Sequence, residues 1–198
     1  MSERSWVKPE TISVPETLRA AVGGHPLVAE TLVQRGITSP AAALGFLDPT
    51  RYLPAAASEL PGMGRAIARL GRAIRAREPI CVWGDFDVDG QTATALLVAA
   101  LRDLGGQVTY HVPNREREGH GVAVDVLEEV IDAGASVILT CDTGISAHEA
   151  ASYARRKGVD FIITDHHDLP GALPDATATI NPKLLPSNHP LGALPGVG

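Results

Sequence analysis

The sequence predicts an α/β fold: a parallel sheet of about five strands with flanking helices. From residue 79 onward, short apolar runs alternate with helical patterns about a dozen residues long, as in right-handed βαβ crossovers. The runs at 136–141 and 159–164 are apolar almost throughout, which is typical of strands buried on both faces. We therefore expect a helical lead-in over residues 1–60 and a sheet domain over residues 61–198.

The segment before the sheet favours helices. Residues 26–35 have a helical pattern that ends at a glycine. Ser39 is positioned to cap a second helix, 41–47, with Pro40 at its first position. Residues 48–61 contain three prolines and no long apolar run, which indicates a linker.

Residues 62–77 predict an amphipathic helix. Apolar side chains recur at spacings of three and four positions, which places on one face Met63, Ile67, Leu70 and Ile74. Arginines fall largely on the other side, at positions 65, 69, 72, 75 and 77. We interpret them as a solvated charged face, with a contact surface for a phosphate backbone as the alternative.

The later elements follow in order, and their helices end at glycines. The predicted strands are 80–83, 108–112, 136–141, 159–164 and 176–180. The predicted helices between them are 92–104, 123–132 and 147–157. In the first of these helices, the side chains expected to face inward are Leu97, Ala100, Leu101 and Leu104.

The composition is that of an ordinary globular protein. The 198 residues are 44% hydrophobic and 20% charged, which excludes a disordered chain, a collagen and a coiled coil. No stretch reaches ~18 apolar residues, so no membrane contact is predicted. Cys81 and Cys141 form no disulfide framework, and both lie in apolar runs. We expect buried thiols in a reducing cytoplasm.

Charge is distributed unevenly along the chain. Residues 1–80 hold 10 Lys and Arg against 7 Asp and Glu, whereas residues 81–198 hold 7 against 16. An acidic second half argues against simple electrostatic binding of nucleic acid. Bound cations would reverse this conclusion, because they invert the local charge.

Acidic residues and histidines follow three of the predicted strands at the point where each strand ends. They are Asp85, Asp87 and Asp89 after the first strand, Asp142 after the third, and Asp165, His166 and His167 after the fourth. The carboxyl ends of parallel strands share one edge of the sheet, where open α/β sheets place their sites. These side chains are therefore expected to converge.

Converging carboxylates repel one another unless they share protons or bind cations. Aspartates with one or two histidines suit Mn²⁺, with Mg²⁺ as the second choice. The alternating aspartates of residues 85–89 can serve two neighbouring ions, with Asp142 as the bridging ligand. Two such ions about 3.5–4 Å apart form a hydrolysis or phosphoryl-transfer site.

Each motif also has a plainer interpretation. Residues 85–90 resemble half of a calcium loop, but the twelfth position from Asp85 is Leu96 rather than glutamate, so that loop is rejected. Asp142 alone could cap a helix, and the two histidines alone could be turn residues. In residues 113–121, Arg115 could bind a phosphate, or the segment could be a polar loop with self-compensating charges.

The motifs together resemble the DHH phosphoesterase superfamily. The resemblance lies in residues 85–90 (DFDVDG), 142–144 (DTG) and 165–167 (DHH). Within it, the closer resemblance is to the RecJ family of bacterial single-strand-specific 5′→3′ DNA exonucleases. That similarity extends over residues 35–37, 46–49, 113–121, 181–183 and 194–198.

The resemblance implies a role for each matching residue. Asp87, Asp89 and Asp142 would ligate two Mn²⁺ ions, with Asp142 bridging, and His166 would ligate the second ion. Many members have a histidine ligand where this chain has Trp83, so Asp85 is expected to replace it. His167 would contact the scissile phosphate, and Asp165 would orient the histidines. Asn114 and Arg115 would hold substrate phosphate.

The resemblance also implies single-stranded DNA as substrate, a use in recombination and repair, and repair or replication proteins as partners. The family has a fourth-motif aspartate and a second domain beyond the DHH triplet. This chain stops at Gly198, so we expect a portion of a longer protein that lacks its C-terminal domain.

Three alternatives stay open. The first is a phosphodiesterase of short oligonucleotides or cyclic dinucleotides, or a pyrophosphatase. The second is a DHH protein that binds DNA without cutting it. The third, a nucleotide-binding Rossmann domain, is disfavoured because no G-x-G-x-x-G turn follows the first strand.

Overall fold

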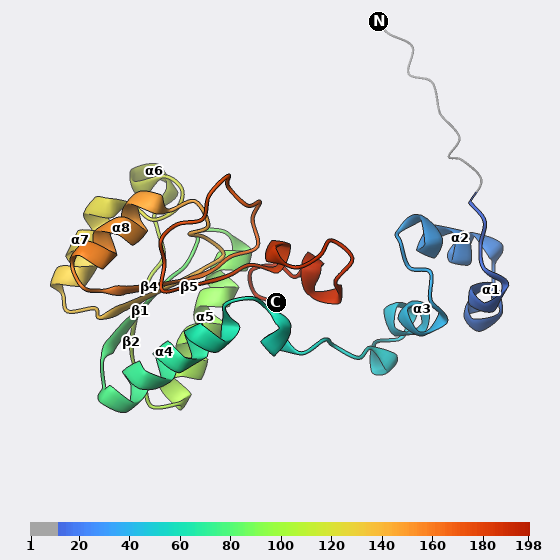
Figure 1. Ribbon diagram of the computed structural model, residues 1–198, viewed down its shortest axis with the longest axis horizontal. Helices are drawn as coiled ribbons and strands as arrows, with labels where there is room; N and C mark the ends of the chain where they lie inside the picture. The colour runs from blue at the N-terminus through green and yellow to red at the C-terminus, as the bar shows by residue number, and fades with distance from the viewer. Residues whose placement is uncertain (1–11) are drawn as a thin grey trace, which may run out of the picture. The chain divides into compact units, whose positions relative to one another are not determined.

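The predicted parallel sheet is confirmed by the computed structural model, which describes residues 12–198 (Figure 1). All pairings between neighbouring strands are parallel, in the order β2-β1-β3-β4-β5. The strands are β1 (Pro79–Trp83), β2 (Gln107–His111), β3 (Val137–Cys141), β4 (Asp160–Thr164) and β5 (Ala178–Ile180). The order places β1, β3 and β4, which carry the candidate site, side by side.

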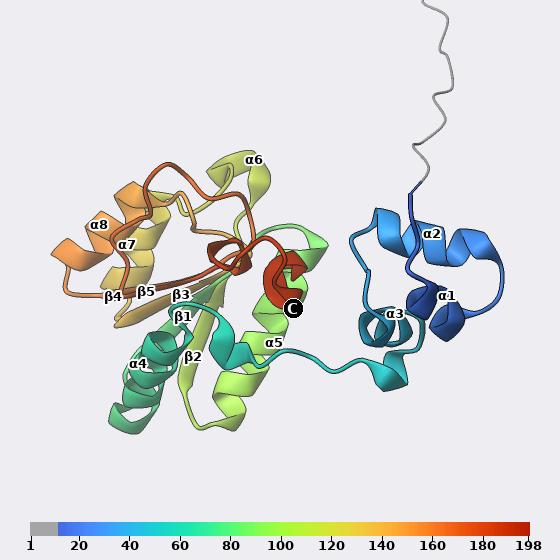
Figure 2. The same cartoon turned by 45° about the vertical axis from the view of Figure 1, so that its right-hand side comes forward.

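Helices cover both faces of the sheet (Figure 2). Helices α4 (Met63–Ala76) and α5 (Val88–Asp103) pack on one face, and α7 (Val124–Asp132) and α8 (His148–Arg156) pack on the other. Alternate residues of each strand enter opposite cores: Val82 and Leu139 face α4 and α5, whereas Cys81 and Ile138 face α7 and α8. This explains the nearly continuous apolar runs in the sequence.

Helix α4 is present as predicted, but its buried face differs from the predicted one. Ile67 is exposed, whereas Ala66 and Ala73 are fully packed in the core. Small alanines let the helix approach the sheet closely, and Met63, Leu70 and Ile74 then pack at its margin. Arg69, interpreted above as solvated, is 6% exposed.

Helix α5 begins earlier than residue 92. Asp87 caps it by accepting a hydrogen bond from the backbone N–H of Gly90, which brings Asp89 into the first helical turn. The buried side chains include Ala93, Val98 and Leu101, while Leu104 is exposed. The shift matters because two candidate ligands now belong to a rigid helix start rather than to a loop.

The chain divides after Pro54 into two compact units. The described part of the first unit contains α1 (Glu16–Val22), α2 (Pro26–Gln34) and α3 (Pro40–Leu47), packed around Leu18, Leu32 and Ala43. Helices α2 and α3 are confirmed, and the Ser39 hydroxyl accepts from the backbone N–H of Ala42 at 3.1 Å. Helix α1 falls within the predicted helical lead-in, but no individual helix was predicted at its residues. Residues 1–11 of the predicted lead-in lie outside the described residues.

The remaining helices are short. They are the 3-10 helices η1 (Pro49–Arg51), η2 (Ala57–Glu59), η3 (Pro182–Leu184) and η4 (Pro190–Ala193), and the α-helix α6 (Arg115–Glu118). Over residues 12–198, no helix has both the length and the apolar character needed to span a bilayer.

Candidate metal centre

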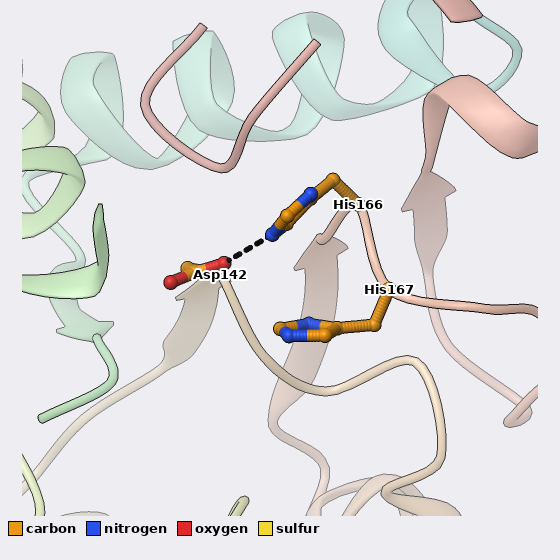
Figure 3. Close-up of side chains that lie close together, drawn as sticks. All are labelled: Asp142, His166 and His167. Carbon is orange, nitrogen blue, oxygen red and sulfur yellow. Dashed lines mark ion pairs between the residues drawn. The ribbon is translucent and has the colours of Figure 1, made fainter. Parts of the chain in front are cut away.

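The segments that follow β1, β3 and β4 meet at the carboxyl edge of the sheet. Ligand atoms of Asp85, Asp87 and Asp142 lie within 4.8 Å of one another, and so do those of Asp142, His166 and His167. Asp142 is common to both groups. Figure 3 shows its carboxylate facing the His166 ring, with the His167 ring directed into the same space.

The turn after β1 is tight enough to require a glycine. A Cβ on Gly90 would lie 2.6 Å from both the backbone N and the Cβ of Asp85. Because Gly90 has no side chain, the backbone of Asp85 packs directly against the first turn of the helix. This packing brings Asp85 and Asp87 to the same side of the loop.

Asp142 is the most constrained of the candidate ligands. It is 1% exposed and has φ 60°, a left-handed conformation that is unfavourable for a non-glycine residue. Its Oδ1 lies 2.9 Å from Nε2 of His166. No group in the described chain makes a hydrogen bond to that oxygen with acceptable geometry. A buried carboxylate oxygen without a donor is the atom that a cation would satisfy.

Electrostatics supports the same conclusion. Burial and, after it, the nearby carboxylates of Asp89 and Asp87 together raise the pKa of Asp142 to about 7. Without a cation, the Asp142 carboxyl group therefore competes for a proton near neutral pH. The donor set of carboxylates with an imidazole fits a divalent cation between hard and borderline, such as Mn²⁺.

Asp89 does not belong to the group of ligand atoms formed by Asp85, Asp87 and Asp142. Its Oδ2 is 3.6 Å from Nε2 of His166, so it faces the histidine side of the centre. Its two carboxylate oxygens accept hydrogen bonds from the backbone N–H groups of Gly196 and Val197, each at 2.8 Å. The three aspartates of one motif are thus divided between the two sides of Asp142.

Asp165 is buried and holds the histidine segment in place. Its Oδ1 accepts from the backbone N–H groups of His166 and His167 and lies 2.7 Å from Nδ1 of His167. Its Oδ2 accepts from the backbone N–H of Ile145 at 2.8 Å, which ties the turn after β3 to the turn after β4. Burial lowers the pKa of His167, but the hydrogen bond and charge of Asp165 outweigh it and raise that pKa.

Trp83 stands at the position where the resemblance to the DHH superfamily implies a histidine ligand in many members. It is fully buried, and its ring lies 4.3 Å from that of His111. His111 Nε2 is 2.6 Å from a carboxylate oxygen of Glu118 in α6. This position therefore contributes packing rather than a ligand, and Asp85 lies in a cluster that could hold a cation instead.

Asn114 and Arg115 lie outside both ligand clusters. The side chain of Asn114 caps α6 by accepting from the backbone N–H of Glu116. The guanidinium carbon of Arg115 stands 4.6 Å from the centroid of the Phe86 ring, within the loop that carries Asp85 and Asp87. Arg115 is therefore held beside the centre by a cation–π contact rather than by a carboxylate.

Two residues were missed as site components by the residue patterns. Asn181 is fully buried, and its side chain donates to the backbone carbonyl of His167 at 3.0 Å. Gly196 packs against Asp142. Only the family resemblance at 181–183 and 194–198 signalled these positions, because their partners are distant in sequence.

Comparison with known proteins identifies the family. The profile described as "DHH family, N-terminal domain" matches residues 79–193. The chain is 39% identical over 176 residues to the single-stranded-DNA-specific exonuclease RecJ of Bacillus subtilis, covering 87% of this chain and 22% of that protein. It is 46% identical over 142 residues to the protein of that name from Escherichia coli, covering 71% and 24%.

Solved structures agree with the sequence relatives. RecJ from Thermus thermophilus in complex with Mn²⁺ matches with a TM-score of 0.73 and 30% identity, over 94% of this chain and 26% of that one. Exonuclease RecJ bound to manganese matches with a TM-score of 0.64 and 35% identity, over 70% and 37%. The chain thus spans about a quarter of the length of these curated relatives. The match over residues 79–193, together with the sheet and its three converging motifs, shows that the chain belongs to the DHH family.

Proposed function

We propose that this chain is the catalytic-domain portion of a Mn²⁺-dependent 5′→3′ exonuclease that hydrolyses single-stranded DNA by a two-metal mechanism. The observation that carries the proposal is the shared position of Asp142 between an aspartate cluster and a histidine cluster. A buried carboxylate between two donor sets is what a pair of cations requires. Mg²⁺ is the second choice of metal.

Each donor set would hold one cation. Asp85 and Asp87 with Asp142 would hold the first, and Asp89 and His166 with Asp142 would hold the second. When bound, such a pair lowers the pKa of water and stabilises the charge that develops on a scissile phosphate. It would also neutralise the acidic edge that otherwise repels DNA.

The other site residues would act on the substrate. His167 is half-exposed, and Asp165 fixes its ring and raises its pKa, so it can present a positive charge or a proton to the phosphate. Arg115 and Asn114 would bind a neighbouring phosphate from the loop after β2. Exonuclease action, 5′→3′ polarity and a use in repair are proposed from the resemblance and from the names of the relatives.

The first experiment is a calorimetric titration of Mn²⁺ into this chain. We expect binding that Asp142→Ala abolishes and that Asp103→Ala retains. Asp103 is a matched control because it is the last residue of α5, the helix that Asp87 caps at its other end. An Asp142→Ala variant that binds like the starting chain would contradict the shared-ligand assignment.

Substrate class is tested separately. Residues 55–198 can replace the matching segment of the Escherichia coli relative, to which this chain is 46% identical over 142 residues. We expect the chimera to release mononucleotides from single-stranded DNA with Mn²⁺, and the Asp142→Ala chimera to release none. Cleavage of dinucleotides or cyclic dinucleotides in preference to long strands would favour the short-oligonucleotide phosphodiesterase instead.

A further inference from the structure

The segment after η4 returns to the candidate metal centre from the far end of the chain. Leu191 is buried in the core shared by α4, α5 and the sheet, and Leu194 packs against the same core. His189 Nε2 lies 3.0 Å from a carboxylate oxygen of Glu59. These anchors fix the direction in which residues 195–198 leave the core.

Two consecutive backbone N–H groups of this segment donate hydrogen bonds to one carboxylate. Gly196 donates to Oδ2 of Asp89 and Val197 donates to Oδ1, each at 2.8 Å. A carboxylate held through both oxygens has one orientation, in contrast to a side chain that rotates freely in the first turn of a helix. Each oxygen keeps a second lone pair for a cation.

Gly196 also touches the central ligand. A Cβ at this position would lie 2.6 Å from Oδ1 and 2.7 Å from Cγ of Asp142. Gly196 has no left-handed φ, so its backbone conformation is open to any residue and the requirement for glycine is one of space. The atom it approaches is the oxygen that lacks a hydrogen-bond donor in the described chain.

On its other side, the segment borders an apolar cavity. Val197 and Gly198 line this cavity together with Ile67 and Leu70 of α4 and Leu97 of α5. Val197 is 37% exposed beside this cavity, so the Gly196–Val197 peptide is held by its two hydrogen bonds to Asp89.

We infer that the backbone of Gly196 and Val197 is a positioning clamp for the second cation. It orients the Asp89 carboxylate toward His166. Because Gly196 has no side chain, it also leaves Oδ1 of Asp142 free to bind a cation. This inference rests on the proposed two-metal function. It assigns a role to residues that supply no ligand themselves, as supporting groups around metal ligands commonly do.

The first test needs no metal. Amide hydrogen exchange measured by NMR on the metal-free chain should show protected N–H groups at Gly196 and Val197. Asp89→Ala removes both acceptors and should lose this protection, while the amides of β3 stay protected. Rapid exchange at both positions in the starting chain would overturn the clamp.

The second test uses Mn²⁺ itself. Gly196→Ala should bind one of two Mn²⁺ ions about 10- to 100-fold more weakly, followed by the electron paramagnetic resonance signal of free Mn²⁺. Gly192→Ala is the matched control, because a Cβ there would meet nothing closer than 3.9 Å. Circular dichroism of the metal-free variants should be unchanged.

The outcomes separate the clamp from the function. If Gly196→Ala binds both ions as the starting chain does, the clamp is overturned and the two-metal proposal stands. If the starting chain binds no Mn²⁺, the proposed function fails and the clamp's role fails with it. Should Gly196→Ala not fold, Val197→Pro removes one donor without adding an atom beside Asp142. It should weaken the same ion, and unchanged binding by it would overturn the clamp.

Discussion

Asp142 Oδ1 lies 2.9 Å from His166 Nε2, although the two residues follow different strands, β3 and β4. Because these strands are adjacent and parallel, their carboxyl ends meet, and one short contact joins the DTG motif to the DHH motif. This contact gives the buried carboxylate a partial partner. A cation bound between the two groups would take over that role.

The two donor sets predict distinct stoichiometries. Asp87→Ala should leave one Mn²⁺ bound on the histidine side, and His166→Ala should leave one on the aspartate side. Asp142→Ala should leave none, because it removes a ligand from both sets. Calorimetry with each variant measures the number of ions bound. Loss of both ions from Asp87→Ala and His166→Ala alike would show instead that the ions bind only as a pair.

The metal-free chain should become less stable as pH rises toward neutrality. Burial, Asp89 and Asp87 raise the pKa of Asp142 to about 7 from 3.8. Between these values, the folded chain keeps a proton that the unfolded chain has lost, so the free energy of unfolding falls with rising pH. Asp142→Asn cannot titrate there. We expect the starting chain to lose stability relative to it, on the order of a few kcal/mol between pH 5 and pH 8.

Urea denaturation in the presence of a chelator measures this difference. Adding Mn²⁺ should reverse the trend for the starting chain, since the ligand form of Asp142 is the deprotonated one. Parallel pH profiles for the starting chain and Asp142→Asn would contradict the raised pKa.

Much of this architecture could be predicted, because the apolar runs and helical periodicities are local properties of the sequence. The five strands and the edge that gathers Asp85, Asp142 and His166 follow from those patterns and from the handedness of βαβ units. The start of α5 was predicted too late. The sequence shows an aspartate-rich loop, and only the hydrogen bond from Gly90 N–H to Asp87 reveals a helix cap.

Features that depend on distant partners could not be predicted. No helix was predicted over residues 115–118, but in α6 the Glu118 carboxylate accepts from the backbone N–H of Asn114 and contacts His111. The contacts of Gly196 with Asp89 and Asp142 join ends of the domain that no local pattern connects. Burial of Arg69 likewise depends on where Asp160 falls in the sheet.

Arg115 should matter for DNA and not for metal. Its guanidinium stands over Phe86 and outside both ligand clusters. Arg115→Ala should weaken binding of single-stranded DNA about tenfold and reduce the salt dependence of binding by about one phosphate contact. Mn²⁺ affinity should not change. Fluorescence anisotropy over a range of salt concentrations measures both effects.

The control for this prediction is Arg117→Ala, which removes the same charge from the same short helix without touching Phe86. Equal losses from the two variants would mean that the helix contributes only general positive charge. A loss of Mn²⁺ affinity in Arg115→Ala would instead place this residue in the metal centre.

Arg69 should be a major determinant of stability. Its side chain is 7% exposed and pairs with Asp160 at the start of β4 and, at 2.5 Å, with Glu78 just before β1. Burial lowers the pKa of Arg69, but its hydrogen bonds to Asp160 and Glu78 outweigh this and raise it. Arg69→Ala would leave the carboxylates of Asp160 and Glu78 without the cation that they share. The expected loss is about 3 kcal/mol, at the low end for a broken buried pair, because both carboxylates are about one-third exposed.

Arg72→Ala is the matched control in α4. Its guanidinium reaches the same Asp160 at 3.8 Å but is 63% exposed, so its removal should change stability by less than about 1 kcal/mol. Urea denaturation of both variants distinguishes the two arginines. If both substitutions lower the free energy of unfolding equally, the charged face of α4 is solvated, as the periodicity alone suggests. If only Arg69→Ala is strongly destabilised, α4 is fastened to the amino ends of β1 and β4 by a buried charge.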